Sequence, residues 1–82
     1  DESDIDSYNQ IGFNNIKLAN IELKNNKISK AKKLLNESIV YCDKGIEMDD
    51  DCAEIYDTRG YAKTKLANIE RYNIEFSDIY NL

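Results

Sequence analysis

The chain has 82 residues and a formal net charge of −5, from 16 acidic and 11 basic side chains. This length allows at most one small domain, which buries only about 60% of the surface of its unfolded chain. The acidic balance argues against nucleic acid as the main ligand, because phosphate binding needs a basic face. No run of about 18 apolar residues occurs, so no segment is predicted to span a membrane.

The first predicted helix covers roughly the first 24 residues. Apolar and small residues recur along it every three or four positions: Ile5, Tyr8, Gly12, Ile16, Ala19 and Leu23. Ser3, Asp4 and Asp6 supply capping oxygens and negative charge at its N-terminus. The segment 24–27, Lys-Asn-Asn-Lys, then interrupts the pattern. Because Asn tolerates left-handed backbone, a helical hairpin turn is predicted there.

The second predicted helix begins near Ser29, a candidate N-cap, and runs to about Met48. Its apolar and small residues form the clearest stripe of the chain: Ile28, Ala31, Leu35, Ser38, Ile39, Cys42, Gly45 and Ile46. Three consecutive Asp residues at 49–51 end this helix and introduce the third. Asp51 and Glu54, three positions apart, are predicted to form a variant of the capping box.

The C-terminal end of the third predicted helix has two interpretations. The helix carries Ile55, Tyr56, Arg59, Gly60, Ala62, Leu66 and Ala67. By analogy with the first helix, it continues to about Tyr72 and turns near Asn73. A separate stripe of Ile69, Tyr72, Phe76 and Ile79 favours an early turn at Ala67-Asn68 and a fourth helix from about Ile69. We prefer the early turn, because otherwise the last helix is too short to pack.

The sequence repeats itself at an offset of 48 residues. Lys-Leu-Ala-Asn-Ile-Glu occurs at 17–22 and again at 65–70, and 11 of the 27 aligned pairs between 8–34 and 56–82 are identical. A fixed period of about 20–50 residues is typical of a repeat array, in which each unit buries its apolar face against its neighbours. We therefore predict one all-α domain over 1–82. Copy one covers about 4–50, and copy two covers about 51–82 and stops short of the full first copy.

Two stretches of this repeat resemble the tetratricopeptide repeat (TPR) family. Residues 18–39 supply a Leu and a small residue in the first helix and an Ala in the second, and residues 53–70 place Tyr56 and Gly60 in the aromatic and glycine positions. The resemblance implies three to four helices in consecutive antiparallel hairpins, as in a fragment of an α-solenoid. It also implies a scaffold or regulatory module that binds proteins or peptides. The period departs from the usual value of about 34 residues, so a general helical-hairpin array is the alternative.

In the TPR family, the first helix of each repeat lines a concave groove, and Asn amides there hold the main chain of an extended peptide. Two equivalent stripes in this chain each place an aromatic residue, a Lys and an Asn in the same order on one helix face. They consist of Asn9, Phe13, Lys17 and Asn20 in copy one, and of Asp57, Tyr61, Lys65 and Asn68 in copy two. The hypothesis is a peptide-binding groove with Asn20 and Asn68 on the ligand backbone and Phe13 and Tyr61 as aromatic walls. The alternative is that duplication copied solvated residues and that the aromatic rings pack between helices.

Charge separates toward the two ends of the chain if the first two helices are antiparallel. The acids at one end are Asp1, Glu2, Asp4, Asp6, Glu47, Asp49, Asp50, Asp51 and Glu54. The lysines at the other end are Lys24, Lys27, Lys30, Lys32 and Lys33. Capping and solubility explain the acids, but lysines near a helix N-terminus are unfavourable. The basic end is therefore a hypothetical docking site for an acidic partner or for the acidic end of another copy.

The sequence offers little for catalysis. It has no His, no glycine-rich phosphate loop and no Cys–His or Ser–His pair, so neither an enzyme nor a cofactor site is predicted. The triple Asp lacks the spacing of a calcium loop, and no metal site is predicted. Cys42 and Cys52 are expected to be unpaired, semi-buried thiols in a reducing compartment, which makes the cytoplasm the expected location.

Two alternative functions fit the same sequence. The chain is a self-assembling structural helical bundle, with homo-oligomers as its only partners, or it is the peptide-sensing segment of a bacterial regulator. The second alternative depends on the resemblance of residues 53–70 to TPR-like arrays of that type. Neither alternative, nor the preferred role in protein or peptide binding, includes nucleic acid or membrane as a partner.

Overall fold

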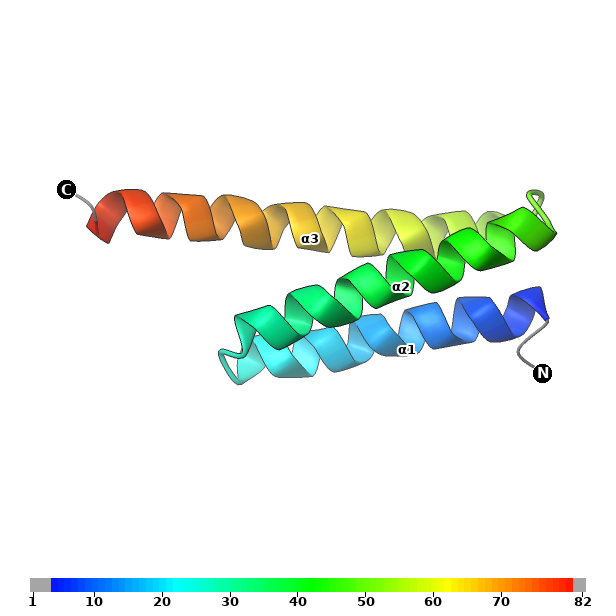
Figure 1. Ribbon diagram of the computed structural model, residues 1–82, viewed down its shortest axis with the longest axis horizontal. Coiled ribbons are helices and arrows are strands. Elements are labelled where there is room, and N and C mark those ends of the chain that lie inside the picture. Colours follow the sequence, from blue (N-terminus) through cyan, green and yellow to red (C-terminus); the bar gives the residue numbers. More distant parts are fainter. Residues whose placement is uncertain (1–3, 81–82) are drawn as a thin grey trace.

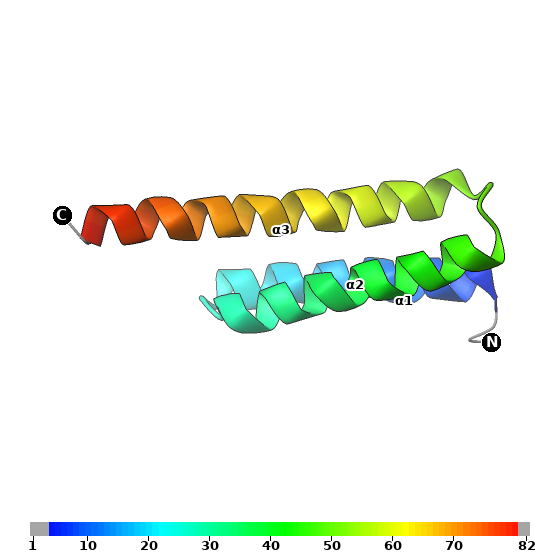
Figure 2. The same ribbon diagram turned by 45° about the horizontal axis from the view of Figure 1, so that its top comes forward.

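The computed structural model describes residues 4–80, with side chains described as far as Arg71. It contains three helices, α1 (Ile5–Lys24), α2 (Ile28–Met48) and α3 (Ala53–Tyr80). The α1 and α2 helices form an antiparallel hairpin, and α3 runs parallel to α1 (Figure 1). A second view shows α3 lying against one face of this hairpin (Figure 2). The predicted all-α class with helical-hairpin packing is confirmed.

The predicted turn between the first two helices is confirmed. The N–H of Lys27 donates to the carbonyl oxygen of Glu22 at 2.8 Å, and the N–H of Asn26 donates to that of Leu23 at 3.1 Å. This pair of hydrogen bonds is the Schellman motif, which requires left-handed backbone at the residue after the C-cap. Asn26 has a φ of 60° and supplies that conformation. The turn thus satisfies carbonyl groups that the end of α1 would otherwise leave without partners.

The three helices begin within about a residue of the predicted positions, but the predicted cap is right only for α1. Asp4 is the N-cap of α1, and its Oδ1 accepts from the N–H of Asp6 at 2.9 Å. The N-cap of α2 is Lys27, with no side-chain hydrogen bond, so the predicted Ser29 cap is wrong. The α2 helix begins at Ile28, directly after the Schellman turn. Ser29 is therefore the second residue of the helix and does not occupy the N-cap position.

The predicted capping box before α3 does not form in the expected register. The α3 helix begins at Ala53, so Asp51 is not the residue that directly precedes it. The N–H of Asp51 instead donates to Oδ1 of Asp49 at 3.0 Å, a local turn of the kind that Asp residues favour.

The third helix continues without a turn to Tyr80. The early turn at Ala67-Asn68, the fourth helix from Ile69 and the later turn near Asn73 are therefore wrong for the described backbone. The residue equivalent to Asn26 in copy two is Ile74. A β-branched residue rarely adopts positive φ, so copy two lacks the residue on which the first hairpin turn depends.

The α2 helix is central and packs against both other helices. Its buried residues are Ala31, Leu35, Ser38, Cys42 and Gly45, all within the predicted stripe. Together with residues of α1 and α3, Ala31 and Leu35 form the main core cluster, and Leu66 and Ile69 of α3 pack against it. This packing favours continuation of α3 beyond residue 68, because a turn there would remove Ile69 from the core.

The hairpin closes tightly where α1 crosses α2. The hydroxyl of Ser38 donates to the carbonyl oxygen of Gly12 at 2.8 Å in a buried hydrogen bond. A Cβ atom on Gly12 would lie 2.9 Å from Sγ of Cys42, which is closer than side chains normally approach. Glycine is therefore required at this crossing for the two backbones to come together.

A second close contact joins all three helices at Gly45. A Cβ atom there would overlap the side chain of Ile55 in α3 and lie 3.3 Å from Cβ of Tyr8 in α1. By contrast, a Cβ atom on Gly60 would have no neighbour within 4 Å. A larger residue would therefore clash at Gly12 and Gly45 but not at Gly60.

Alanine substitutions at Gly45 and Gly60 are expected to change stability in opposite directions. Gly45→Ala should lower the free energy of unfolding by about 1–3 kcal/mol, because it overpacks the junction of the three helices. Gly60→Ala should raise it by about 0.5–1 kcal/mol, because it replaces an exposed helical glycine without a clash. Urea denaturation followed by circular dichroism measures both. A Gly45→Ala protein as stable as the unsubstituted chain would contradict the packing of α3 on α2.

Candidate functional site

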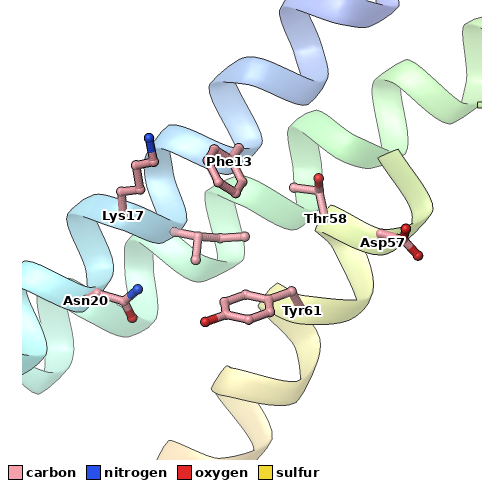
Figure 3. Close-up of a pocket in the computed structure, with 7 residues that line it drawn as sticks. Phe13, Lys17, Asn20, Asp57, Thr58 and Tyr61 are labelled. Atoms are coloured by element: carbon pink, nitrogen blue, oxygen red, sulfur yellow. The ribbon is translucent and has the colours of Figure 1, made fainter. Parts of the chain in front are cut away.

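A groove of about 300 Å³ lies between α1 and α3. Its lining residues are Phe13, Ile16, Lys17 and Asn20 from α1 and Asp57, Thr58 and Tyr61 from α3 (Figure 3). Five of these seven belong to the eight residues predicted from the sequence. The structure thus brings residues from both copies of the repeat into one hollow, because α1 and α3 run in the same direction (Figure 1).

The groove has an apolar floor and two aromatic walls. Ile16, which is 3% exposed, belongs to the core and forms the floor. The walls remain open to solvent, since Phe13 is 46% exposed and Tyr61 is 53% exposed. The alternative interpretation of the sequence expected these rings to pack between helices. The structure instead leaves both rings about half exposed. An open apolar hollow with a few polar groups around it is the usual form of a binding site.

A lysine stands beside each aromatic wall, one helical turn further along the chain. Nζ of Lys17 lies 4.8 Å from the centroid of the Phe13 ring, and Nζ of Lys65 lies 5.7 Å from that of Tyr61. Both distances allow attraction between the ammonium group and the face of the ring. Each ammonium group therefore lies beside an aromatic ring, but only Lys17 belongs to the groove lining.

Asn20 carries a buried oxygen without a hydrogen-bond partner. Its Oδ1 atom makes no hydrogen bond within the described part of the chain. The amide points into the space in front of Tyr61 (Figure 3). An unpaired buried acceptor costs about 1–3 kcal/mol. Because this oxygen has almost no exposed surface, an N–H donor in the groove can reach it only after the amide turns toward the groove. Oε2 of Glu22 is also buried without a partner, but Glu22 does not line this groove.

Asn9 lies outside the groove and joins its two walls. The hydroxyl of Thr58 donates to Oδ1 of Asn9 at 2.7 Å and also lies 3.0 Å from the carbonyl oxygen of Glu54. Thr58 is 8% exposed, so this link between α1 and α3 is largely shielded from water. Asn9 therefore positions α3 against α1, whereas the sequence had placed it on the ligand face.

The other two predicted residues lie beyond the lining of the groove. Lys65 is half-buried one turn past Tyr61, and Asn68 is exposed. Sequence reasoning also missed two lining residues, Ile16 and Thr58. Ile16 belonged to the predicted core stripe and lies next to Lys17 in the sequence, so its place at the edge of that stripe was the available signal. Nothing in the sequence around Thr58 marks it as a lining residue.

The remaining polar features have simpler roles. Both cysteines are free, and burial raises the pKa of the Cys42 thiol, with smaller opposing effects from Ser38 and Arg59. Cys42 therefore packs as a neutral thiol. The carboxylates at 49–51 come within 4.8 Å of one another, and all three residues are exposed. No described helix is both long and apolar enough to cross a bilayer.

The two charged ends lie as the antiparallel hairpin requires. Acidic residues gather where α1 begins and α2 ends, and the lysines between 24 and 33 surround the turn at the opposite end (Figure 1). Nζ of Lys32 lies 4.0 Å from Oε1 of Glu70 in α3, and this ion pair offsets part of the positive charge at the basic end. Docking of a partner at this end stays a prediction.

No family model, no curated protein and no solved structure matches the chain. The resemblance to the TPR family therefore stays a prediction, and the three-helix architecture is consistent with other helical-hairpin proteins as well.

The link between the groove walls should be measurable as stability. Thr58→Val removes the hydroxyl at nearly constant volume and leaves Oδ1 of Asn9 without its donor, so the free energy of unfolding should fall by about 1 kcal/mol. Thr64→Val is the matched control, because Thr64 is exposed on the same helix, and its effect should stay within about 0.5 kcal/mol. Equal effects of the two substitutions in urea denaturation would show that the Asn9–Thr58 contact contributes nothing.

Proposed function

We propose that the chain is a protein- or peptide-binding module, in the role of a scaffold or regulator, and that the α1–α3 groove receives the partner. The observation that carries this proposal is the convergence of five residues from the two repeat copies around one open apolar hollow. The site contains hydrophobic surface for affinity and polar groups for orientation, the usual combination at recognition sites.

The unpartnered oxygen of Asn20 supports a ligand with a polar main chain. An extended peptide presents unpaired N–H groups along its length. One of them can donate to Oδ1 of Asn20 if the amide turns toward the groove, while a neighbouring side chain enters the hollow. The open rings of Phe13 and Tyr61 then cover that side chain. Aromatic residues are enriched among the residues that dominate binding energy, and Phe13 and Tyr61 are the aromatic lining residues in the described part of the chain.

Substitution of one groove wall tests the proposal. The immobilised protein selects binders from a phage-displayed library of random dodecapeptides, and the selected peptides are synthesised for affinity measurement by fluorescence anisotropy. Phe13→Ser should weaken their binding about tenfold or more, since it removes a large part of the buried apolar contact. Asn20→Ala should also weaken binding, and more than Asn68→Ala, because only Asn20 lines the groove.

Leu18→Ser is the matched control for Phe13→Ser. Leu18 is 49% exposed, close to the 46% of Phe13, but it does not line the groove. This substitution should change affinity by less than about twofold, as expected for a residue outside the contact. If both substitutions weaken binding equally, or if neither weakens it, the groove is not the binding site of the selected peptides.

A second candidate function is self-assembly, which the exposed apolar side chains of α1 favour. Leu18 is 49% exposed and Ile21 is 52% exposed, whereas their repeat equivalents Leu66 and Ile69 pack against the core. The same two residue types therefore form a helix contact in copy two and face solvent in copy one. A second copy of the chain would bury them.

Sedimentation equilibrium separates the two functions. As a binding module, the chain should sediment with the mass of a monomer from micromolar to millimolar concentration. A mass that grows with concentration, and that Leu18→Gln with Ile21→Gln returns to the monomer value, would establish self-assembly instead. Phe13→Ser serves as control here, because it removes similar exposed apolar surface from a different face of α1.

A further inference from the structure

Each aromatic wall of the groove has a lysine of its own helix beside the ring. In α1 the pair is Phe13 and Lys17, which Figure 3 shows next to each other. In α3 the pair is Tyr61 and Lys65. Residues four apart share a helix face, and a helical side chain leans over the turn that precedes its own Cα atom. The ammonium groups accordingly lie 4.8 Å and 5.7 Å from the centroids of the two rings.

The two rings stand beside an apolar hollow that they do not fill. Phe13 and Tyr61 are each about half exposed, and Ile16 is the floor of the hollow between them. An aromatic side chain of a helix has two common χ1 rotamers, so its ring can move without any change in the backbone. A rotation that carried a ring over Ile16 would bury more apolar surface, which is favourable in itself. An interaction that favours the open position of each ring opposes this collapse.

The lysines supply such an interaction. An ammonium group within about 6 Å of a ring centroid is attracted to the face of the ring, and the aliphatic part of the lysine covers apolar surface at the same time. Both pairs meet this distance. The attraction favours the position in which each ring lies beside its lysine, and the hollow is open in that position.

Lys65 allows this role to be separated from direct contact with a ligand. Lys17 is itself a lining residue, so it can act on the Phe13 ring and on a ligand. Lys65 is half-buried and lies beyond the lining, so a ligand in the hollow meets Tyr61 and not Lys65. A short-range effect of Lys65 on binding must therefore act through the Tyr61 ring.

We propose that Lys65 is a positioning residue of the groove, which holds the Tyr61 ring in its open position, and that Lys17 does the same for Phe13. This inference deepens the proposed function and rests on it, because the same groove is the binding site. A wall that is already open does not have to be moved or ordered when a ligand binds, and this preorganisation raises affinity. The rings supply the apolar contact, and the lysines keep them available for it.

Substitutions of Lys65 test the proposal with the peptides selected by phage display, whose Kd is measured by fluorescence anisotropy. Lys65→Gln removes the ammonium group and should raise the Kd about threefold. Lys65→Arg keeps a cation that stacks on aromatic rings, so the Kd should stay within about 1.5-fold of its original value. Lys63→Gln is the matched control, because it makes the same change in net charge at an exposed residue of α3 outside the lining. It should change the Kd by less than about 1.5-fold.

A double-mutant cycle shows whether Lys65 acts through Tyr61. Tyr61→Leu keeps an apolar wall but removes the aromatic face that attracts the ammonium group. In the Tyr61→Leu protein, Lys65→Gln should therefore have no further effect on the Kd, so the two substitutions are non-additive. An equal effect of Lys65→Gln in the presence and absence of the ring would overturn the positioning role.

The outcomes separate this inference from the proposed function. If Phe13→Ser weakens binding but Lys65→Gln has no larger effect than Lys63→Gln, or Lys65→Arg fails to preserve the Kd, the positioning role is wrong and the groove remains the binding site. If the peptides bind without sensitivity to Phe13→Ser, both proposals are wrong. A loss of affinity with Lys65→Gln that is absent in Lys65→Arg, and absent once Tyr61 is replaced, supports both.

Discussion

The close crossing of α1 and α2 at Gly12 is the contact on which the rest of the structure depends. Ser38 donates its buried hydroxyl to the carbonyl oxygen of Gly12, and there is no space for a Cβ atom between the two helices. This approach aligns the small residues of α2 into one surface that also receives α3. A wider crossing would move α2 and separate Gly45 from Ile55, where α3 is packed. α3, packed on α2 at Gly45, also reaches α1 through the hydrogen bond from Thr58 to Asn9, and the groove lies beside this contact.

The duplicated residues of the chain occupy different environments, and this difference gives each helix its role. Ala19 is fully buried, but its copy-two equivalent Ala67 is exposed. Leu66 packs against the core, but its equivalent Leu18 is about half exposed. Copy one uses one side of its helix to meet α2, and copy two uses the other side. Identical residues therefore make contacts on different faces, and the groove residues occupy the face that neither contact covers.

Much of the fold could be predicted from local sequence signals. The stripes of α1 and α2, the end of α2 at Met48 and the turn at Asn26 all follow from residues close in the sequence. The continuation of α3 could not be predicted in this way, because the Asn residues at 68 and 73 are also turn formers. Two other features favour the continuous helix. Ile69 packs against the core, and the residue equivalent to Asn26 is Ile74, a β-branched residue that rarely adopts the positive φ of Asn26.

The candidate site could be predicted only in part, for a related reason. Helical periodicity correctly placed Phe13, Lys17 and Tyr61 on faces that meet. It could not separate Asn9, which is hydrogen-bonded to Thr58, from Asn20, whose oxygen has no partner, because both lie on the same stripe. The distance between α1 and α3 decides which amide is paired, and these two helices separate toward the C-terminal end of α3 (Figure 1). One Asn therefore joins the two walls, while the other leaves a buried acceptor without a partner, at a cost of about 1–3 kcal/mol. This difference in pairing adds support to the proposal of a partner at the groove, whose main basis is the open apolar hollow that both repeat copies line.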